Sequence, residues 1–256
     1  MAKIFITGSS DGLGQLAAKQ LTIEGHEVFL HARNATRAKD ALTAVPKGSK
    51  VFIADLANIA EIKRLAAEVN ELGRLDAIIH NAAVYKSAEN EHTGDGLPLT
   101  FAINTLAPYI LTCLIQMPQR LVYMSSDMHM GGDATMRDLV NGKFNSTYSD
   151  TKLHDLMLAK AVARKWPDVY SNAVHPGWVP TKMGGAAAPD DLTKGFETQT
   201  WLAVSEDRDA KVTGHYFHHK KTTHFLSAAA DVKLQEQLLE VCEKLSGVPF
   251  PTPLAV

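Results

Sequence analysis

The chain has 256 residues, of which 26 are lysine or arginine and 28 are aspartate or glutamate, giving a net charge of −2. This length suits one large α/β domain with a sizeable core, and the balanced charge gives no reason to expect nucleic acid or an anionic membrane as a partner. Cys113 and Cys242 are the only cysteines, so neither a disulfide framework nor a cysteine-built metal site is expected.

The N-terminal sequence shows no targeting or anchoring segment. The first strand pattern begins at Lys3, and no apolar run approaches the roughly 20 residues that span a bilayer. We therefore expect a cytoplasmic protein without a membrane anchor.

A glycine-rich turn follows the first predicted strand, residues 3–6. Glycines stand at positions 8, 12 and 14, and the apolar residues after them repeat with the 3.6-residue period of a helix. At such a strand-to-helix turn, backbone N–H groups and the helix N-terminus can hold a pyrophosphate. The spacing Gly-x-x-x-Gly-x-Gly therefore favours a dinucleotide site over the alternative, a plain glycine-rich turn.

A second strand, predicted over residues 26–31, ends just before Arg33 and Asn34. In dinucleotide-binding folds an acidic residue near this point binds the ribose 2′-hydroxyl, whereas an arginine suits a 2′-phosphate. Arg33 stands in place of the acid, with Arg37 and Lys39 close behind, and a guanidinium matches the geometry of a phosphate. We expect NADP(H) to be preferred over NAD(H); the alternative is a solvated arginine in a surface loop.

Strands and helices then alternate along the chain. Further strands are predicted over residues 50–54, 75–80, 120–124, 169–175 and 214–217, and helices over residues 58–72, 95–114, 148–166, 192–205 and 231–245. This order predicts a Rossmann-type α/β fold, a doubly wound parallel sheet of about seven strands with helices on both faces, in a single domain covering residues 1–256. Substrate loops are expected at about residues 127–147, 178–200 and 218–230.

Several polar residues follow the predicted strands directly. Ligands of doubly wound sheets bind beyond the carboxyl ends of the strands. That is where Gly8, Arg33, Asp55, Asn81 and Ser126 all fall. The architecture alone therefore implies a nucleotide site.

The chemistry is predicted to centre on Tyr148 and Lys152, four residues apart in a predicted helix. Residues at this spacing share one helix face, so the phenol and the ammonium lie side by side. A free tyrosine has a pKa of about 10, and a nearby positive charge stabilises its phenolate and lowers that pKa. The pair could then exchange a proton with a carbonyl or alcohol oxygen. Taken alone, the same spacing also fits an ordinary helix surface.

Together these motifs resemble the short-chain dehydrogenase/reductase family in its single-domain form. The matching residues are Thr7-Gly8-x-x-x-Gly12-x-Gly14, Asp55-Leu56, Asn81-Ala82-Ala83, Asn104, Ser125-Ser126, Tyr148-x-x-x-Lys152 and Pro176-Gly177-x-x-x-Thr181. The resemblance covers residues 3 to about 181, plus the strand Gly214-x-Tyr216-Phe217. The residues most similar to the branch of retinol dehydrogenases and related carbonyl reductases are Asp95-Gly96-Leu97, Phe101 and Asn104-Thr105-Leu106.

This resemblance implies an NAD(P)-dependent oxidoreductase that interconverts a carbonyl and an alcohol. Tyr148 would be the acid/base, and Ser126 would hydrogen-bond the substrate oxygen. Lys152 would lower the pKa of the tyrosine and hold the nicotinamide ribose, and Asn104 would complete a proton relay. The implied cofactor contacts, with adenine at Asp55 and Leu56 and the carboxamide at Thr181, are Gly8, Ser10, Asp11, Gly12, Leu13, Gly14, Arg33, Asn34, Asp55, Leu56, Asn81, Ala82, Ala83, Tyr148, Lys152, Pro176, Gly177, Val179 and Thr181.

Two positions depart from the family pattern. Ala83 replaces the glycine that usually follows the Asn-Ala pair, which narrows the approach to the cofactor. Asp11 stands before Gly12, where some NADP enzymes carry a basic residue. The preference for NADP is therefore expected to rest on Arg33 nearly alone.

The substrate is expected to be a small, apolar carbonyl or alcohol compound, because several methionines and Trp178 fall in the loops beside the predicted cleft. The alternatives are an NAD-dependent alcohol dehydrogenase of the same fold, a non-catalytic NADP-sensing protein, and a sugar-nucleotide epimerase or dehydratase. Retention of Tyr148 and Lys152 argues against a sensor. The segment after Thr181 is too short for the added substrate domain of an epimerase.

Four histidines lie close together near the C-terminal end, at positions 215, 218, 219 and 224. No carboxylate or cysteine stands at ligand spacing from them, and a metal site needs three or four convergent ligands. No metal is therefore expected.

The apolar helix that contains Leu106 and Leu114 fits either the core or the interface of a homo-oligomer. Pro108 lies inside it, four residues after Asn104. A proline has no N–H to donate to the carbonyl of residue 104, and its ring pushes that turn open. We expect the freed carbonyl of Asn104 to connect Lys152 to solvent through a water; the alternative is a bend that only fits the helix over the sheet.

Overall fold

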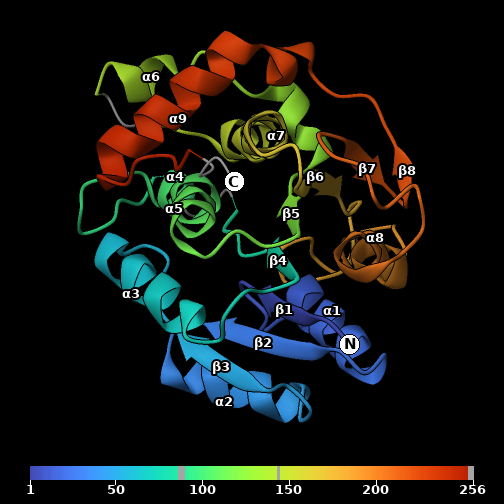
Figure 1. Cartoon of the computed structure of the whole chain (residues 1–256). Coiled ribbons are helices and arrows are strands. Elements are labelled where there is room, and N and C mark those ends of the chain that lie inside the picture. Colours follow the sequence, from blue (N-terminus) through green and yellow to red (C-terminus); the bar gives the residue numbers. More distant parts are fainter. Residues whose placement is uncertain (86–89, 143–144, 253–256) are drawn as a thin grey trace.

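The computed structural model describes residues 1–85, 90–142 and 145–252. One sheet of eight strands runs through this part of the chain in the order β3-β2-β1-β4-β5-β6-β7-β8 (Figure 1). The strands are β1 (Lys3–Ile6), β2 (Glu27–Ala32), β3 (Lys50–Ile53), β4 (Ala77–His80), β5 (Arg120–Met124), β6 (Tyr170–His175), β7 (Tyr216–His218) and β8 (Lys221–Thr222). The first seven are parallel, which confirms the predicted Rossmann-type fold in a single domain.

Helices cover both faces of this sheet (Figure 1). On one face α1 packs against α8, and on the other α3 packs against α5 while α9 lies against α5 and α7. The α-helices are α1 (Gly12–Ile23), α2 (Ala35–Ala44), α3 (Ile59–Asn70), α4 (Leu99–Phe101), α5 (Ala107–Leu114), α6 (Arg137–Val140), α7 (Tyr148–Lys165), α8 (Leu192–Val204) and α9 (Val232–Ser246). The described residues also form a π-helical turn, η2 (Ala102–Leu106), and the 3₁₀ turns η3 (Asp127–Gly131) and η4 (Ser227–Ala230).

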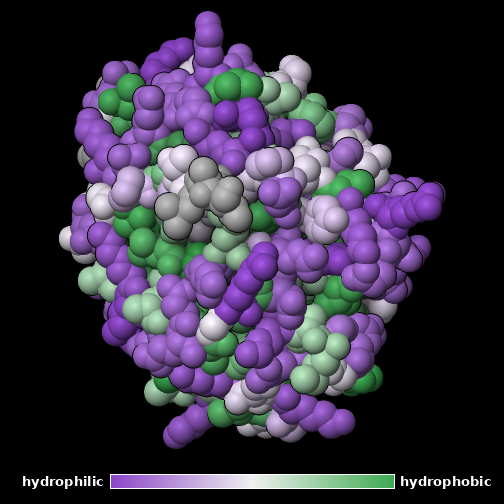
Figure 2. Space-filling view, viewed as in Figure 1, coloured by the Kyte–Doolittle hydropathy of each residue, from purple (hydrophilic) through white to green (hydrophobic). Residues whose placement is uncertain are grey.

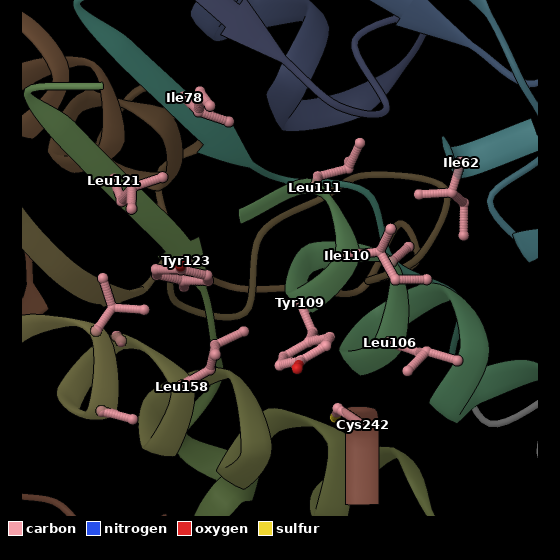
Figure 3. Close-up of a cluster of buried hydrophobic side chains, with 14 of the residues drawn as sticks. Ile62, Ile78, Leu106, Tyr109, Ile110, Leu111, Leu121, Tyr123, Leu158 and Cys242 are labelled. Atoms are coloured by element: carbon pink, nitrogen blue, oxygen red, sulfur yellow. The ribbon is translucent and has the colours of Figure 1, made fainter. Parts of the chain in front are cut away.

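Alternation along the strands divides the core into two apolar clusters. Phe5 of β1 enters the cluster beneath α3, α5, α7 and α9, whereas its neighbours Ile4 and Ile6 enter the cluster beneath α1 and α8. Successive side chains of a strand point to opposite faces, so a strand buried on both faces reads as a continuous apolar run. Figure 3 shows the first cluster, which includes Ile78 of β4, Leu121 and Tyr123 of β5, Tyr109 of α5 and Cys242 of α9.

Most predicted elements lie within two residues of their observed bounds, and the exceptions have local causes. The helix predicted from residue 95 begins only at Leu99, because Gly96 adopts a positive φ of 77° and the Thr93 N–H donates to the Leu97 carbonyl across a turn. The sheet has eight strands, not about seven. The extra strand β8 returns antiparallel through a turn in which His219 and Lys220 both have positive φ.

The predicted substrate loops contain more regular structure than expected. Residues 127–147 include η3 and α6, and residues 143–144 of that loop lie outside the described residues. The loop predicted over residues 178–200 ends at residue 191, because α8 begins at Leu192 with the Asp191 carboxylate capping its first turn. The loop predicted over residues 218–230 contains β8 and η4.

The apolar helix around Pro108 belongs to the core. Leu106, Ile110 and Leu111 are fully buried within the chain itself, so their burial does not need a second subunit (Figure 3). The predicted opening of the helix is confirmed as the π-turn η2, in which the Ala107 N–H bonds to the carbonyl five residues back, and Pro108 occupies the first turn of α5. The proposed water on the Asn104 carbonyl stays a prediction.

The outer surface is mainly polar. On the face shown in Figure 2 hydrophilic residues dominate, and hydrophobic ones form small groups among them. In the described ranges, no helix combines the length and the apolar character needed to cross a bilayer.

Candidate active site

The carboxyl ends of the parallel strands border one cavity of about 690 Å³, within the size range of small-molecule and cofactor sites. Among the predicted site residues, those that line it are Gly8, Ser10, Asp11, Gly12, Leu13, Arg33, Asp55, Leu56, Asn81, Ala82, Ala83, Tyr148, Lys152, Pro176 and Thr181. Among the described residues, the predicted positions outside its walls are Gly14, Asn34, Asn104, Ser126, Gly177 and Val179. The structure therefore brings together predicted residues from five separate strand ends and from the start of α7.

The glycine turn between β1 and α1 requires glycine at specific points. A Cβ on Gly8, where φ is 63°, would lie 2.8 Å from the Cα of Ala82, and a Cβ on Gly14 would lie 2.3 Å from Nδ2 of Asn81. Gly12 also has a positive φ, 54°, and opens α1 behind the cap of Asp11. Gly12 and Leu13, the first residues of α1, line the cavity, and the Gly12 N–H donates to Oδ1 of Asp11 at 2.8 Å. A helix N-terminus at such a glycine turn can hold a pyrophosphate.

Asn81, at the end of β4, holds the glycine turn in place. Its Nδ2 donates to the carbonyls of Thr7 and Gly8 at 3.0 and 3.2 Å, and its backbone N–H donates to Oγ1 of Thr7. The side chain therefore fixes the relative position of two strand ends. We assign it a structural role in shaping the cavity floor.

His31, the penultimate residue of β2, also lines the cavity and was not predicted from the sequence. Its Nδ1 accepts the Gly8 N–H at 3.0 Å, so Nε2 carries the proton and donates to the Ala54 carbonyl at 3.0 Å. Burial lowers the pKa of His31 to about 4. The imidazole is therefore neutral at pH 7 and joins the glycine turn to β2 and to the end of β3.

The end of the cavity near Arg33 carries an exposed cluster of charges. Arg33 is exposed, and beside it the Asp11 carboxylate pairs with Arg37 at 2.9 Å and with Lys182 at 2.6 Å. Burial acts to raise the pKa of Asp11, but hydrogen bonds from Lys182 and Arg37 outweigh it and lower that pKa to about 2. All four side chains line the cavity. Arg37 and Lys182 thus add basic groups beside Arg33, on which the preference for NADP was expected to rest nearly alone.

Tyr148 begins helix α7 because a capping box sets the start of the helix. The Thr147 hydroxyl accepts the Asp150 N–H at 3.2 Å, and the Asp150 carboxylate accepts the Thr147 N–H at 2.7 Å. Tyr148 is 7% exposed at the cavity wall, and the ring of Tyr85 meets its ring edge-on at 4.7 Å.

Lys152 lies one turn further along α7, with its ammonium 5.5 Å from the centroid of the Tyr148 ring, as the spacing predicts. Its Nζ donates to the Met124 carbonyl at the end of β5 and to Oδ2 of Asp155, both at 2.7 Å. Lysine and aspartate are each 3% exposed in their side chains. The charge beside the tyrosine is therefore held in one place by two buried acceptors.

The pKa of Tyr148 differs from the sequence expectation. Burial raises it above the ordinary value of 10, and Lys152 only partly opposes that rise. The negative charges of Asp155 and Asp127 raise it further. Lys152 thus lowers the pKa as predicted, but desolvation outweighs it, and in the protein alone the tyrosine is a neutral phenol at pH 7.

A family comparison identifies this arrangement. The model of the family described as short chain dehydrogenase matches residues 2–192. The chain belongs to the short-chain dehydrogenase family. It is therefore an NAD(P)-dependent dehydrogenase or reductase, and its fold carries the nicotinamide cofactor site that this family shares.

Relatives of this short-chain dehydrogenase match it over nearly their whole length. An uncharacterized oxidoreductase of Emericella nidulans is 46% identical over 98% of this chain and 99% of its own. The short-chain dehydrogenase chry4 of Gibberella zeae is 39% identical over 99% and 100% of the two chains. Among solved structures, a blue fluorescent protein from a metagenomic library in complex with NADPH superposes with a TM-score of 0.69 at 21% identity, covering 85% of this chain and 95% of its own.

Ser126 lies beside the dehydrogenase cavity, not in its wall. Its Oγ accepts the Met128 N–H at 3.2 Å, which caps η3, and donates to Oδ1 of Asp127 at 3.2 Å. The preceding Ser125 lines the cavity instead, and its hydroxyl donates to the Lys152 carbonyl at 2.6 Å. Contact of Ser126 with a substrate oxygen therefore requires its hydroxyl to exchange partners.

Asn104 of η2 is buried, and its side chain is used within the protein. Nδ2 donates to the Val84 carbonyl and to Oγ1 of Thr151, both at 3.0 Å, while Oδ1 accepts the Val84 N–H at 2.8 Å. The side chain thus joins the segment after β4 to α7. Any part of Asn104 in a proton relay would fall to its backbone carbonyl.

The remaining predicted positions, Asn34, Gly177 and Val179, lie outside the cavity wall and make contacts within the fold. Asn34 caps α2 by accepting the Arg37 N–H at 2.9 Å, and Val179 packs against Gly195 of α8. Gly177, with φ of 87°, donates its N–H to Nδ1 of His175. Within the described residues, no three histidine, cysteine or acidic side chains converge as metal ligands.

Proposed function

We propose that this dehydrogenase uses NADP(H) to interconvert a carbonyl and an alcohol on a small apolar substrate, with Tyr148 as the acid/base. The observation that carries the proposal is the position of the tyrosine. Its side chain and the buried ammonium of Lys152 form one wall of the same cavity whose floor is the glycine turn at Gly8 and Gly12. A proton donor, a fixed positive charge and a pyrophosphate cradle thus share one cavity.

The neutral phenol suits Tyr148 as an acid. A carbonyl oxygen that gains negative charge during reduction needs a proton and hydrogen-bond donors, and an acid/base in position contributes about 10² to 10⁴ in rate. Lys152 stabilises the phenolate that remains after the proton has left. The Ser126 hydroxyl supplies a second donor once it has left Asp127.

The cofactor site is proposed on the cavity walls described above. When bound, the nicotinamide supplies or accepts the hydride. The glycine turn would hold the pyrophosphate, and Asp55 and Leu56 would border the adenine. Lys152 would hold the nicotinamide ribose and Thr181 the carboxamide.

A preference for NADP(H) is supported by the basic end of the cavity. Arg33 and Arg37 stand where a 2′-phosphate would lie in this fold, and Lys182 reaches the same place from the loop after β6. A phosphate would compete with Asp11 for Arg37 and Lys182. Guanidinium and ammonium groups prefer the doubly charged partner, which favours the phosphorylated cofactor.

The proposal of an apolar substrate is supported by the side chains at the Tyr148 end of the cavity. Near Tyr148 the walls are the side chains of Val84, Leu99, Ile103 and Met183. Met183 is 42% exposed at the mouth, where a flexible thioether can adapt to different substrates.

A panel of aldehydes, ketones and secondary alcohols, followed by NADPH absorbance, tests the proposal. We expect reduction of small apolar aldehydes or ketones with NADPH, slower reaction with NADH, and turnover lowered by about 10² to 10⁴ in Tyr148→Phe. Near-normal turnover in Tyr148→Phe would contradict the proposed acid/base, and equal rates with NADH would contradict the proposed cofactor preference.

A further inference from the structure

Asp155 is a buried carboxylate directly behind the catalytic pair. It lies on α7, three residues beyond Lys152, and its Oδ2 accepts from the lysine Nζ at 2.7 Å. Its side chain is 3% exposed, the same as that of Lys152. An ammonium has three N–H groups, and here two of them donate to the fixed acceptors Asp155 and the Met124 carbonyl.

A lysine this deeply buried holds its proton only if a counter-charge is present. Burial disfavours the charged form, and buried lysines without a partner titrate several pH units below their ordinary value. A backbone carbonyl offers a dipole but no charge. Burial accordingly acts to lower the pKa of Lys152, yet Asp155, together with Tyr148, overcomes it and leaves that pKa above the ordinary value of 10.5.

We propose that Asp155 is a positioning residue of the catalytic centre, whose carboxylate keeps the Lys152 ammonium charged and fixed beside Tyr148. Asp155 does not itself touch the cavity wall, so it acts through the lysine. The proposal rests on the proposed role of Tyr148 as acid/base, but its test needs neither substrate nor cofactor.

The described titratable groups around this pair include Tyr216 of β7, whose pKa burial raises so that it stays neutral. Tyr148 is influenced by Lys152 and Asp155 on its own helix, by Tyr85 beyond β4 and by Asp127 of η3. From β5, Tyr123 faces Asp155, and burial raises the pKa of this tyrosine so that it stays neutral.

His80 of β4 stacks on the Tyr123 ring at 4.8 Å, and burial lowers the pKa of the histidine to about 3. It is therefore uncharged at neutral pH. Burial also raises the pKa of Asp155, to about 6, against the opposing effect of Lys152, so the carboxylate is ionised at pH 7.

The sign of the effect on Tyr148 separates two roles of Asp155. The carboxylate's own negative charge raises the pKa of Tyr148, so if it acted only directly, its removal would lower that pKa. If Asp155 acts by holding the charge of Lys152, its removal discharges the lysine, and the larger stabilising effect on the phenolate is lost. The pKa of Tyr148 then rises.

The test is an NMR titration of protein labelled with ¹³C at the tyrosine ζ-carbons, with Tyr148→Phe identifying the resonance. In Asp155→Asn we expect the titration of Tyr148 to move to higher pH than in the wild-type protein. In the Lys152→Met background the same substitution should move it to lower pH, because only the direct effect remains. A titration that falls or stays in place in Asp155→Asn alone would overturn the proposal.

Two further measurements guard against a general effect of substitution. Glu206→Gln removes the partner of Arg120, a second buried cation, which lies on β5 and not on α7. This variant should leave the Tyr148 titration unchanged. Should Asp155→Asn fail to fold, labelling of the lysine ε-carbons in the wild-type protein serves instead. We expect Lys152 to hold its proton up to at least pH 10.5, and loss of the proton below that pH would overturn the proposal.

Discussion

The two ends of the cavity use charge in opposite ways. At the Tyr148 end, Lys152 and Asp155 form an ion pair whose side chains are 3% exposed and whose acceptors are fixed by β5 and α7. At the Arg33 end, the Asp11 carboxylate is 39% exposed and shares its charge between Arg37 and Lys182, the latter 78% exposed. Water can replace either partner at the exposed end, but not at the buried end.

This difference determines what each end can do. An exposed pair contributes about 0 to 1 kcal/mol, so its members can change partners and accept a phosphate at little cost. Removing one member of a buried pair costs about 3 to 5 kcal/mol, so the pair stays assembled. The charge of Lys152 therefore stays in place beside Tyr148. We therefore propose that the buried end carries the chemistry and that the exposed end selects the cofactor.

The largest expected effect comes from Tyr148→Phe at the buried end. The ring keeps its contacts and loses only the acid, so turnover should fall by about 10² to 10⁴. The dissociation constant for NADPH, measured by fluorescence, should stay near the wild-type value. Near-normal kcat in this variant would remove Tyr148 from the mechanism.

Ser126→Ala, also at the buried end, should lower kcat by less than Tyr148→Phe does at most. Loss of a donor to the developing charge costs about 3 kcal/mol, or roughly a hundredfold in kcat. Ser126 also caps η3, so thermal unfolding of the variant should be measured alongside. Ser125→Ala is the matched control for stability, and an equal loss of kcat and of stability in both would mean that Ser126 only supports the fold.

At the exposed end, Arg33→Ala and Arg37→Ala should each weaken NADPH binding and leave NADH binding nearly unchanged. A hydrogen bond to a charged group contributes about 1.5 to 3 kcal/mol, which corresponds to roughly ten- to a hundredfold in selectivity. Lys39→Ala, on the same helix as Arg37 but outside the cavity wall, is the control. Equal losses for both cofactors would show that the two arginines are structural.

His31→Gln should have the smallest effect at neutral pH. The folded protein holds His31 neutral down to a pKa of about 4, whereas an unfolded histidine takes up a proton near 6.5. The stabilisation from this neutral histidine is therefore complete above pH 6.5 and is lost as pH falls toward 4, by about 3 kcal/mol in all.

Urea unfolding of the two proteins at several pH values checks this prediction. Between pH 6.5 and 4 the free energy of unfolding should fall less in the variant than in the wild-type protein. The difference corresponds to the one proton that His31 takes up on unfolding. The exposed His92→Gln is the control and should show the wild-type slope. An unchanged slope in His31→Gln would mean that the imidazole is charged or not protected in the folded protein.

Much of the fold was predictable because its strands are buried on both faces and their apolar runs are continuous. The elements that the sequence analysis missed have weak local signals. Helix α2 carries only two buried alanines, Ala38 and Ala41, and β8 has two exposed residues after a turn without glycine. The sequence of residues 219–222 contains no residue type that predicts the turn before β8.

The site was predicted where motif and geometry coincide, as at Tyr148 and Lys152. His31 and Lys182 were missed because each acquires its role through a contact between distant parts of the chain. Lys182, for instance, reaches Asp11 across 171 positions of sequence. Asp155 stands at the i, i+3 spacing from Lys152 on α7, so helix periodicity could have paired the two residues, but not revealed their burial. The raised pKa of Tyr148 was also beyond the sequence, because helix spacing reports the neighbouring charge but not the burial that outweighs it.

The division of the cavity into two ends can be measured most directly on the wild-type protein, through the salt dependence of NADPH-driven reduction. Raising the ionic strength from about 0.05 M to about 0.5 M shortens the screening length several-fold and weakens exposed charge contacts far more than buried ones. We expect the KM for NADPH to rise several-fold, the KM for NADH to change little, and kcat at saturating NADPH to stay constant. A fall in kcat with salt, or an equal rise in KM for both cofactors, would contradict this division of roles.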